Sequence, residues 1–574
     1  MAQPTCALKT AADRRPPQAK PAKKKGPNTP RLDPYKRLIN RFYEPLRLLY
    51  VLGQTRGKHT SVPKCADPAQ KSRRRLLENL AYLVVFGKGG KFPPAAAIGL
   101  GEIETGYVFW LASNHSPDLD KMEPFLAFMI GHVRRHLEHP LEFTEAQFIR
   151  QCVAYATSRI EKEQYLLERF IACVINKSIP KPYSDVDRAL VQWLQMFLNK
   201  EPLELCYLAY DQRKSENIRL ITRRGHPLDD ESHQSETIQR YVALRHVIGR
   251  LASHIRAPRQ VLWDAQRHRN LFDEGVSNVQ RVSPVSSVPR PEPDGLTTPS
   301  SILKRMVKQD NPKMKVYQDA IESMDKHMNI GEKIFESYGN KDFRPCVHCE
   351  VQVLEYFYEN NLRYSHNDRF IACSKPACYC CHLYFLAHPS DPVEPRSHQK
   401  IWPSWSPPLI PEGHHDIKYR HQLNILNTMI ETIRKEALSQ IERRTMDKER
   451  HQDSTTGITP SDSSDLDALE RRLANIRIDH QGVDDEAGDS DSSMSTQSIG
   501  SSSGRSFHET SATDTAPEED EERETWNSHA NSSLLATDDS VIGTDPDTAV
   551  DATVHATVQS DNDDDSDDAG GAVL

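Results

Sequence analysis

Six of the eleven cysteines of this 574-residue chain lie within 36 positions, between Cys346 and Cys381. His348 and Glu350 lie in the same stretch, close to the first of these cysteines. Thiolates next to an imidazole are the ligands that zinc commonly takes in proteins. This density of ligand types therefore predicts a Zn2+ site.

Two ligand sets fit these residues. In the first, His348, Cys378 and Cys381 bind the metal and leave a fourth position open for water, with Glu350 beside it as a proton shuttle. In the second, four thiolates close the site as in a structural zinc ribbon: Cys346, Cys349, Cys378 and Cys381. Because an open site supports hydrolysis and a closed one does not, the function depends on which set binds.

The residues after Glu350 indicate how the chain positions these ligands. Apolar residues follow it at helical spacing: Val353, Leu354, Phe357 and Tyr358. Residues 369–373 are predicted to form a short strand, and Cys378 and Cys381 lie one turn apart at the start of a second helix. Two helix N-termini would then meet over one edge of a sheet, where the helix dipoles favour ionised thiolates.

The rest of the chain divides by composition. A capping box at Thr144 and Gln147 marks one helix start in a region of helical periodicity. Amphipathic spacing over 426–441 predicts a last helix that covers one face of the sheet. The predicted organisation is a disordered basic arm at 1–33, an all-helical domain at 34–275, a Pro/Ser-rich linker at 276–305, a zinc-binding α/β domain at 306–445 and an acidic disordered tail at 446–574.

Charge is unevenly distributed along the chain. Residues 481–574 contain 24 Asp and Glu against 2 Arg, a net charge of −22, whereas the whole chain carries −8. The preceding residues therefore carry +14, which suits a polyanionic partner such as nucleic acid. The helical domain and the acidic tail are candidate sites for protein partners, and the tail is also expected to compete with nucleic acid for the basic body.

The sequence also argues against some classes of protein. It has no apolar run near the roughly 18 residues of a transmembrane helix, and its N-terminus lacks the apolar core of a signal peptide. We therefore expect an intracellular protein without membrane contact, in the nucleus or the cytoplasm, whose cysteines stay reduced. The basic arm makes nuclear import a possible role for that segment.

The pattern His-x-Glu, then a strand, then Cys-x-x-Cys opening a helix resembles the zinc signature of the cytidine deaminase-like superfamily. Two runs resemble its toxin-type nucleic acid deaminase branch, which is expanded in fungi: Cys-Ser-Lys-Pro-x-Cys-x-Cys-Cys at 373–381 and the stretch 397–405. The resemblance covers roughly residues 312–444, under a quarter of the chain. The chain departs from the superfamily at Ala377, which separates Pro376 from the first cysteine of the pair.

This resemblance implies a three-layer α/β/α deaminase domain with a central mixed sheet, zinc on His348, Cys378 and Cys381, and Glu350 as the proton shuttle. The implied reaction is hydrolytic deamination of cytosine or adenine, in a base that is single-stranded or flipped out of a duplex. A loop near the site carries candidate substrate-binding residues: His398, Lys400, Trp402 and Trp405. Its tryptophans could instead cover an edge of the core. A deaminase-fold binding module without turnover and a zinc-ribbon interaction protein stay open as alternatives.

Overall fold

The computed structural model describes residues 33–446, except for residues 64, 89–93, 226–235, 274, 276 and 340–343. The predicted basic arm and the predicted acidic tail, apart from the residues at their inner borders, lie outside the described residues. Among the helices of the described part, none is both long enough and apolar enough to cross a membrane.

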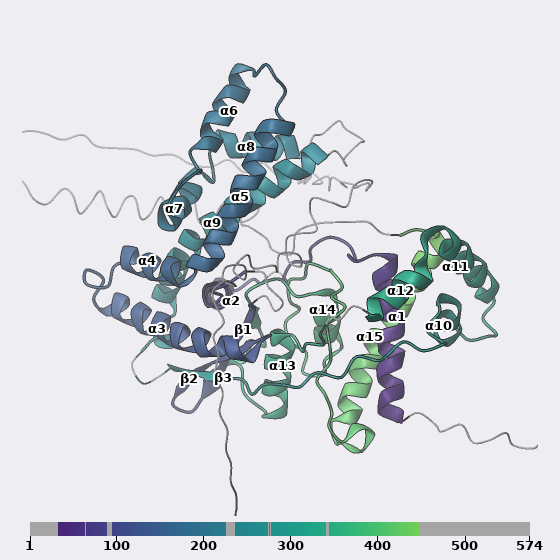
Figure 1. Ribbon diagram of the computed structural model, residues 1–574. Coiled ribbons are helices and arrows are strands. Elements are labelled where there is room, and N and C mark those ends of the chain that lie inside the picture. Colours follow the sequence, from purple (N-terminus) through teal and green to yellow (C-terminus); the bar gives the residue numbers. More distant parts are fainter. Residues whose placement is uncertain are drawn as a thin grey trace, which may run out of the picture.

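A mixed four-stranded sheet lies at the centre of the fold (Figure 1). Its strands are β1 (Ala96–Ile103), β2 (Gly106–Ser113), β3 (Ser277–Arg281) and β4 (Ile371–Cys373), in the order β3-β2-β1-β4. β1 pairs antiparallel with both β2 and β4, whereas β2 and β3 are parallel. The predicted mixed sheet is therefore confirmed, and the predicted strand at 369–373 contributes β4.

Three of these strands come from segments where the sequence predicts none. The predicted all-helical domain at 34–275 contains β1 and β2, and the predicted linker at 276–305 contains β3. β1 has small apolar residues and is buried along most of its length, so it shows no alternation of polar and apolar residues. β3 is a polar edge strand, held by its backbone pairing with β2. The stretch with the predicted metal ligands thus shares one sheet with both preceding segments.

Helices cover both faces of this sheet, which gives three layers. Successive residues of β1 point to opposite faces, with Ala97 in one core and Ile98 in the other. On the Ala97 face α13 (Cys349–Glu359) packs on the strands, and α14 (Tyr379–Ala387) packs against α13. The Ile98 face is covered by α2 (Pro68–Leu83), α3 (Leu119–Glu138) and the C-terminal part of α9 (Glu236–Arg267).

Glycine at position 99 allows α13 to lie close to the sheet. A Cβ added there would lie 2.7 Å from Val353 Cγ1 and 2.7 Å from Phe357 Cε2, both on α13. Since real Cβ contacts are not this short, a side chain here would push α13 outward. The close approach matters for function because the predicted ligand His348 directly precedes this helix.

A second group of helices surrounds α13 and α14 from outside the sheet. It consists of α1 (Pro34–Leu52), α10 (Pro299–Met306), α11 (Met314–Met328), α12 (Ile330–Gly339) and α15 (Tyr419–Arg443). The predicted last helix is α15, and its main contacts are with α1 and α14 rather than with the strands. The buried Arg47 of α1 ties this group together, since it donates to the backbone oxygens of Ser337 at 2.8 Å and Pro403 at 2.9 Å.

The helical N-terminal region projects from the sheet as a bundle with its own core (Figure 1). Its helices are α4 (Glu145–Tyr155), α5 (Thr157–Lys177), α6 (Asp185–Gln195), α7 (Pro202–Gln212), α8 (Glu216–Gly225) and α9. The predicted capping box is present, with Thr144 and Gln147 bonded reciprocally at the start of α4. Short 3-10 turns complete the described chain: η1 (Ser116–Asp118), η2 (Arg269–Leu271), η3 (Ser365–Asn367) and η4 (Gly413–His415).

Candidate metal centre

The first turns of α13 and α14 meet on one side of the sheet. His348 is the residue that precedes α13, and Cys378 is the N-cap of α14, where its Sγ accepts the backbone N–H of Cys381 at 3.4 Å. Both helices therefore direct their positive ends toward the same point, which favours negatively charged ligands there. The sequence predicts this arrangement from helical spacing on either side of a short strand.

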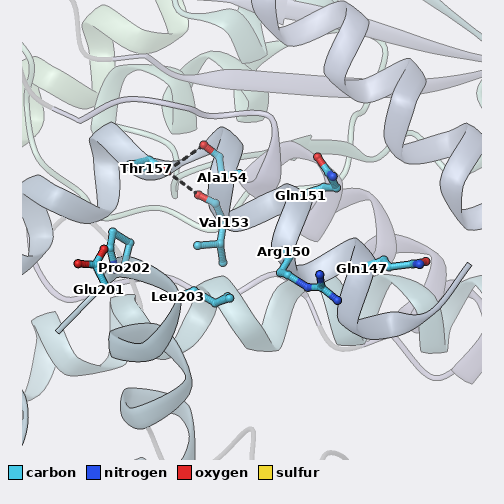
Figure 2. A pocket seen from close by; sticks show the side chains of 9 residues that line it. All are labelled: Gln147, Arg150, Gln151, Val153, Ala154, Thr157, Glu201, Pro202 and Leu203. Atoms are coloured by element: carbon cyan, nitrogen blue, oxygen red, sulfur yellow. Dashed lines mark hydrogen bonds between the residues drawn. The ribbon is translucent and has the colours of Figure 1, made fainter.

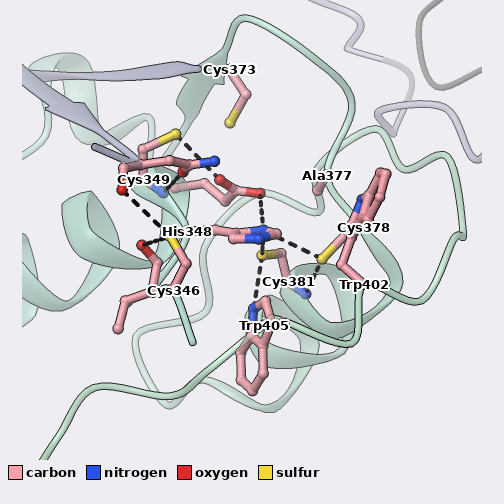
Figure 3. A network of polar contacts seen from close by, with 12 residues as sticks. Cys346, His348, Cys349, Cys373, Ala377, Cys378, Cys381, Trp402 and Trp405 are labelled. Atoms are coloured by element: carbon pink, nitrogen blue, oxygen red, sulfur yellow. Dashed lines mark hydrogen bonds and ion pairs between the residues drawn. The ribbon is translucent and has the colours of Figure 1, made fainter. Parts of the chain in front are cut away.

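Three side chains converge at this point with the separations of a metal site (Figure 3). His348 Nδ1 lies 3.5 Å from Cys378 Sγ and 3.3 Å from Cys381 Sγ, and all three ligand atoms lie within 4.8 Å of one another. A tetrahedral zinc ion with usual bond lengths separates nitrogen from sulfur ligands by roughly 3.5 Å. The residues present therefore fit a zinc ion, bound through Nδ1 of the histidine.

The electrostatics of the cluster also suit a cation. Burial raises the pKa of the Cys378 thiol, but the contact with Cys381 and the charge of His348 outweigh it and lower the pKa to about 6. Burial lowers the pKa of His348, and the Cys378 thiolate more than compensates, so that pKa rises to about 8. Burial and the neighbouring thiolate together raise the pKa of Cys381. A metal ion takes the place of these shared protons when it binds.

Glu350 lies beside the ligand group without belonging to it. Its Oε1 is 4.0 Å from His348 Nδ1, and its side chain is only 8% exposed. The other carboxylate oxygen contacts the Cys349 thiol at 3.5 Å. A buried carboxylate next to a metal position, and outside the ligand set, is placed to hold or move a proton.

The second predicted ligand set does not assemble in the described residues. Cys346 Sγ contacts the backbone oxygen of Asn114 at 3.4 Å, and Cys349 Sγ contacts Glu350, whereas His348 occupies the place beside Cys378 and Cys381. Burial raises the pKa of Cys346 to about 12 and also raises the pKa of Cys349. The geometry therefore matches the open arrangement of ligands.

The four predicted substrate-binding residues occupy different environments. Trp405 is fully buried, and its indole N–H donates to Cys381 Sγ at 3.1 Å, so it contacts a metal ligand rather than solvent. His398 is also buried and accepts the N–H of Trp402 through Nε2 at 3.4 Å. Trp402 and Lys400 keep part of their surface exposed. Trp405 therefore matches the alternative prediction, in which a loop tryptophan covers an edge of the core.

Sequence reasoning missed one residue that shapes the site. Asn114 directly follows β2, and its Oδ1 accepts the backbone N–H of Cys349 at 2.8 Å. It thereby satisfies one free amide at the start of α13 and links that helix to β2. Nothing local marks Asn114 as part of the site, because it lies more than 230 residues before His348.

Comparison with family models matches residues 347–409 to the family described as "OTT_1508_deam:-like deaminase", a family of the cytidine deaminase-like type. The match begins just before His348 and includes the Cys378–Cys381 pair and Trp405. Residues 347–409 are similar to a cytidine deaminase-like domain. No curated protein and no solved structure matches the chain.

The sheet that supports the candidate metal centre extends beyond the matched residues. The match includes β4, α13 and α14, whereas β1, β2 and β3 come from earlier in the chain. Asn114, which holds the start of α13, also lies outside it. The candidate metal centre therefore depends on residues outside the matched segment.

A separate pocket of about 530 Å³ lies in the helical region, among α4, the start of α5 and the start of α7 (Figure 2). Arg150 and Glu201 are among the residues that line it, and the Thr157 hydroxyl donates to the backbone oxygens of Val153 and Ala154. Its lining contains no histidine and no cysteine. This pocket therefore lacks the chemistry of the deaminase centre.

Proposed function

We propose that this protein is a zinc-dependent hydrolytic deaminase that acts on the amino group of a nucleobase, cytosine or adenine, in nucleic acid. The observation that carries the proposal is the placement of His348 Nδ1 at 3.3 and 3.5 Å from two thiols, with the Glu350 carboxylate 4.0 Å from the same nitrogen. The match to a deaminase family over the same residues supports it.

His348, Cys378 and Cys381 would hold the zinc ion. When bound, zinc supplies a hydrolytic water whose pKa is lowered toward neutrality. Glu350 would carry one proton from that water to the ring nitrogen of the base and a second proton, from the newly added hydroxyl group, to the departing amino group. A carbon–oxygen bond forms at C4 of cytosine or C6 of adenine, the carbon–nitrogen bond breaks, and ammonia leaves.

Two neighbours of the ligands keep this arrangement in place. Trp405 donates to Cys381 Sγ, and Asn114 accepts from the backbone of Cys349. Such contacts to ligands and to their backbone orient a metal site and limit its motion. Both partners are themselves anchored, Trp405 in the core and Asn114 at the end of β2.

Charge supports a polymeric substrate. Residues before 481 carry a net charge of +14, which favours association with a phosphate backbone. Trp402 and Lys400 remain candidates for contacts with a base and a phosphate, because part of each residue is exposed. A base within a duplex must first leave the stack to reach a buried carboxylate, so single-stranded nucleic acid is the expected substrate.

The test uses the full chain with zinc bound and a panel of single-stranded DNA, single-stranded RNA and free nucleosides. Ammonia release and the conversion of amino to carbonyl groups are measured for the wild type and for Glu350→Gln. Because a positioned acid–base group contributes roughly 10²–10⁴ in rate, the variant should lose activity by that factor while its zinc content stays unchanged.

Glu359→Gln is the matched control, since Glu359 lies on the same helix and pairs with Lys418 at 2.7 Å. This control should keep full activity. Zinc-loaded protein that binds nucleic acid but releases no ammonia from any substrate would establish a binding module instead. Equal rates for wild type and Glu350→Gln would exclude the proton shuttle.

A further inference from the structure

A second group of metal-ligating side chains lies on the same helices as the deaminase centre. Glu355 belongs to α13, His388 directly follows α14, and His421 lies in the first turn of α15. The Nε2 atoms of both histidines converge on the same oxygen of Glu355, at 3.2 Å from His421 and 3.4 Å from His388. All three ligand atoms lie within 4.8 Å of one another.

These separations also fit the ligands of one ion. A tetrahedral zinc ion with nitrogen and oxygen ligands separates them by roughly 3.3 Å. The usual N–H···O range is roughly 2.7–3.2 Å, so the His421 contact at 3.2 Å is a long hydrogen bond and the His388 contact at 3.4 Å lies beyond that range. The His388 side chain is 0% exposed, and its Nε2 has no hydrogen-bond partner among the described residues. A buried nitrogen without a partner is costly unless something binds it.

The neighbours of the three side chains hold them in position. The Tyr384 hydroxyl donates to Glu355 Oε1 at 2.5 Å, and Ser390 Oγ lies 2.7 Å from His388 Nδ1. Contacts of this kind orient the ligands of metal sites. The Ser390 backbone N–H also approaches Nδ1 at 3.2 Å, so the metal-free ring carries its proton on Nε2. A metal at Nε2 would replace that proton, which would move to Nδ1, where Ser390 Oγ can accept it.

An aromatic ring fixes the histidines against each other. Tyr358 stacks on His421 with ring centroids 4.7 Å apart, and it meets His388 edge to face at 5.0 Å. Glu355 and His388 are buried, whereas the His421 side chain is 19% exposed. The cluster is therefore preorganised, and its accessible side is the one that His421 faces.

We propose that Glu355, His388 and His421 bind a second zinc ion, with a structural role. Two imidazoles and a carboxylate are ligands that suit zinc, and water on the His421 side completes the coordination. The ion would join three elements that are far apart in sequence: α13, the end of α14 and the start of α15. The site does not depend on the deaminase activity, because it shares no ligand with the His348 cluster.

The test is the zinc content of the purified full chain, measured per protein molecule. The wild type should contain two zinc ions and His421→Gln one. Glutamine keeps an N–H donor that can reach Glu355, so a cluster held only by hydrogen bonds would survive this change. His415→Gln is the matched control, since His415 is an exposed histidine just before α15, and it should keep two ions.

His348→Ala separates this proposal from the proposed deaminase function. It should also leave one ion, and the double variant His348→Ala/His421→Gln should leave none. A wild type with a single zinc ion that persists in His421→Gln and is lost in His348→Ala would overturn the second site while leaving the deaminase centre intact.

Cobalt binding is measured on the metal-free wild type, so the result does not depend on whether a variant folds. Two equivalents should bind, and only one of them should show a thiolate-to-cobalt charge-transfer band, because the second site has no sulfur ligand. Saturation at one equivalent, with that band fully developed, would contradict the second site.

Discussion

Two glutamates of α13, Glu350 and Glu355, differ in what surrounds them, although they lie about one and a half turns apart. Glu350, at the start of the helix, lies among thiols and a histidine, next to a position that fits zinc. Glu355 is bonded to Tyr384 and His421 and lies beside His388. Burial raises the pKa of Glu355, but the contacts with His388, His421 and Tyr384 outweigh it and lower that pKa to about 2.

The comparison shows how one helix supports both chemistry and architecture. At its start the helix N-terminus, soft ligands and an adjacent carboxylate create a site that can activate water. One and a half turns later, the Glu355 carboxylate already accepts hydrogen bonds from Tyr384 and His421. These bonds stabilise the packing of α13 with α14 and α15. A catalytic carboxylate must remain able to exchange protons, whereas the oxygens of a structural carboxylate are occupied by hydrogen-bond donors.

The largest expected effect comes from removing the histidine ligand. His348→Ala should abolish deamination and lower the zinc content by one ion per chain, because the metal loses one of its three protein ligands. The double change Cys346→Ala/Cys349→Ala should keep this zinc ion. Metal analysis of both proteins checks the prediction. Retention by the first and loss by the second would support a site of four thiolates.

Gly99→Val should push α13 away from the sheet. The added side chain has to displace Val353 and Phe357, so the free energy of unfolding should fall by about 3 kcal/mol. Urea denaturation measures this change. Gly131→Ala is the control: it adds a Cβ in α3 where nothing lies within 4 Å, and it should leave stability unchanged or slightly raised. Equal effects of the two changes would show that α13 does not need this close contact.

Glu355→Gln should affect folding more than chemistry. The neutral amide weakens charge-assisted hydrogen bonds from His421 and Tyr384, which should lower the free energy of unfolding by about 2 kcal/mol. Denaturation of the metal-free protein isolates this effect from metal binding. The lower limit for one hydrogen bond is about 0.5 kcal/mol. A smaller decrease in the free energy of unfolding would mean that Tyr384 and His421 do not form these hydrogen bonds with Glu355.

Tyr384→Phe should have the smallest effect of the four changes. It removes a single hydroxyl that donates to Glu355, at a cost of about 1 kcal/mol, and the aromatic ring can keep its place in the core. Deamination should continue at the wild-type rate. A large loss of activity would indicate that the Glu355 end of the helix influences the Glu350 end.

Sequence reasoning predicts the elements that carry local signals. The helical spacing after Glu350 predicts α13, the short strand before the cysteine pair predicts β4, and the Thr144 capping box predicts the start of α4. In each case neighbouring residues determine the structure. These signals predict that the starts of α13 and α14 meet, but they leave the choice between the two ligand sets open.

The parts that sequence reasoning missed are set by tertiary contacts. β1 is buried on both faces and contains small residues, so it lacks the alternation that marks a half-buried strand. Trp405 was a candidate for base stacking because of its residue type, but it is buried, and its indole N–H donates to Cys381 Sγ. Glu355, His388 and His421 are far apart in sequence, and no motif spacing connects them.

The order of the strands along the chain has a consequence for protein synthesis. The β1–β2 hairpin ends at Ser113, whereas β4, which pairs with β1, ends at Cys373, about 260 residues later. At the usual rates of translation this interval lasts roughly 13–50 s, during which the hairpin edge has no partner strand from its own chain. The helical bundle is synthesised in the meantime and can fold first. The deaminase centre is therefore expected to form late, when nearly all of the described residues have left the ribosome.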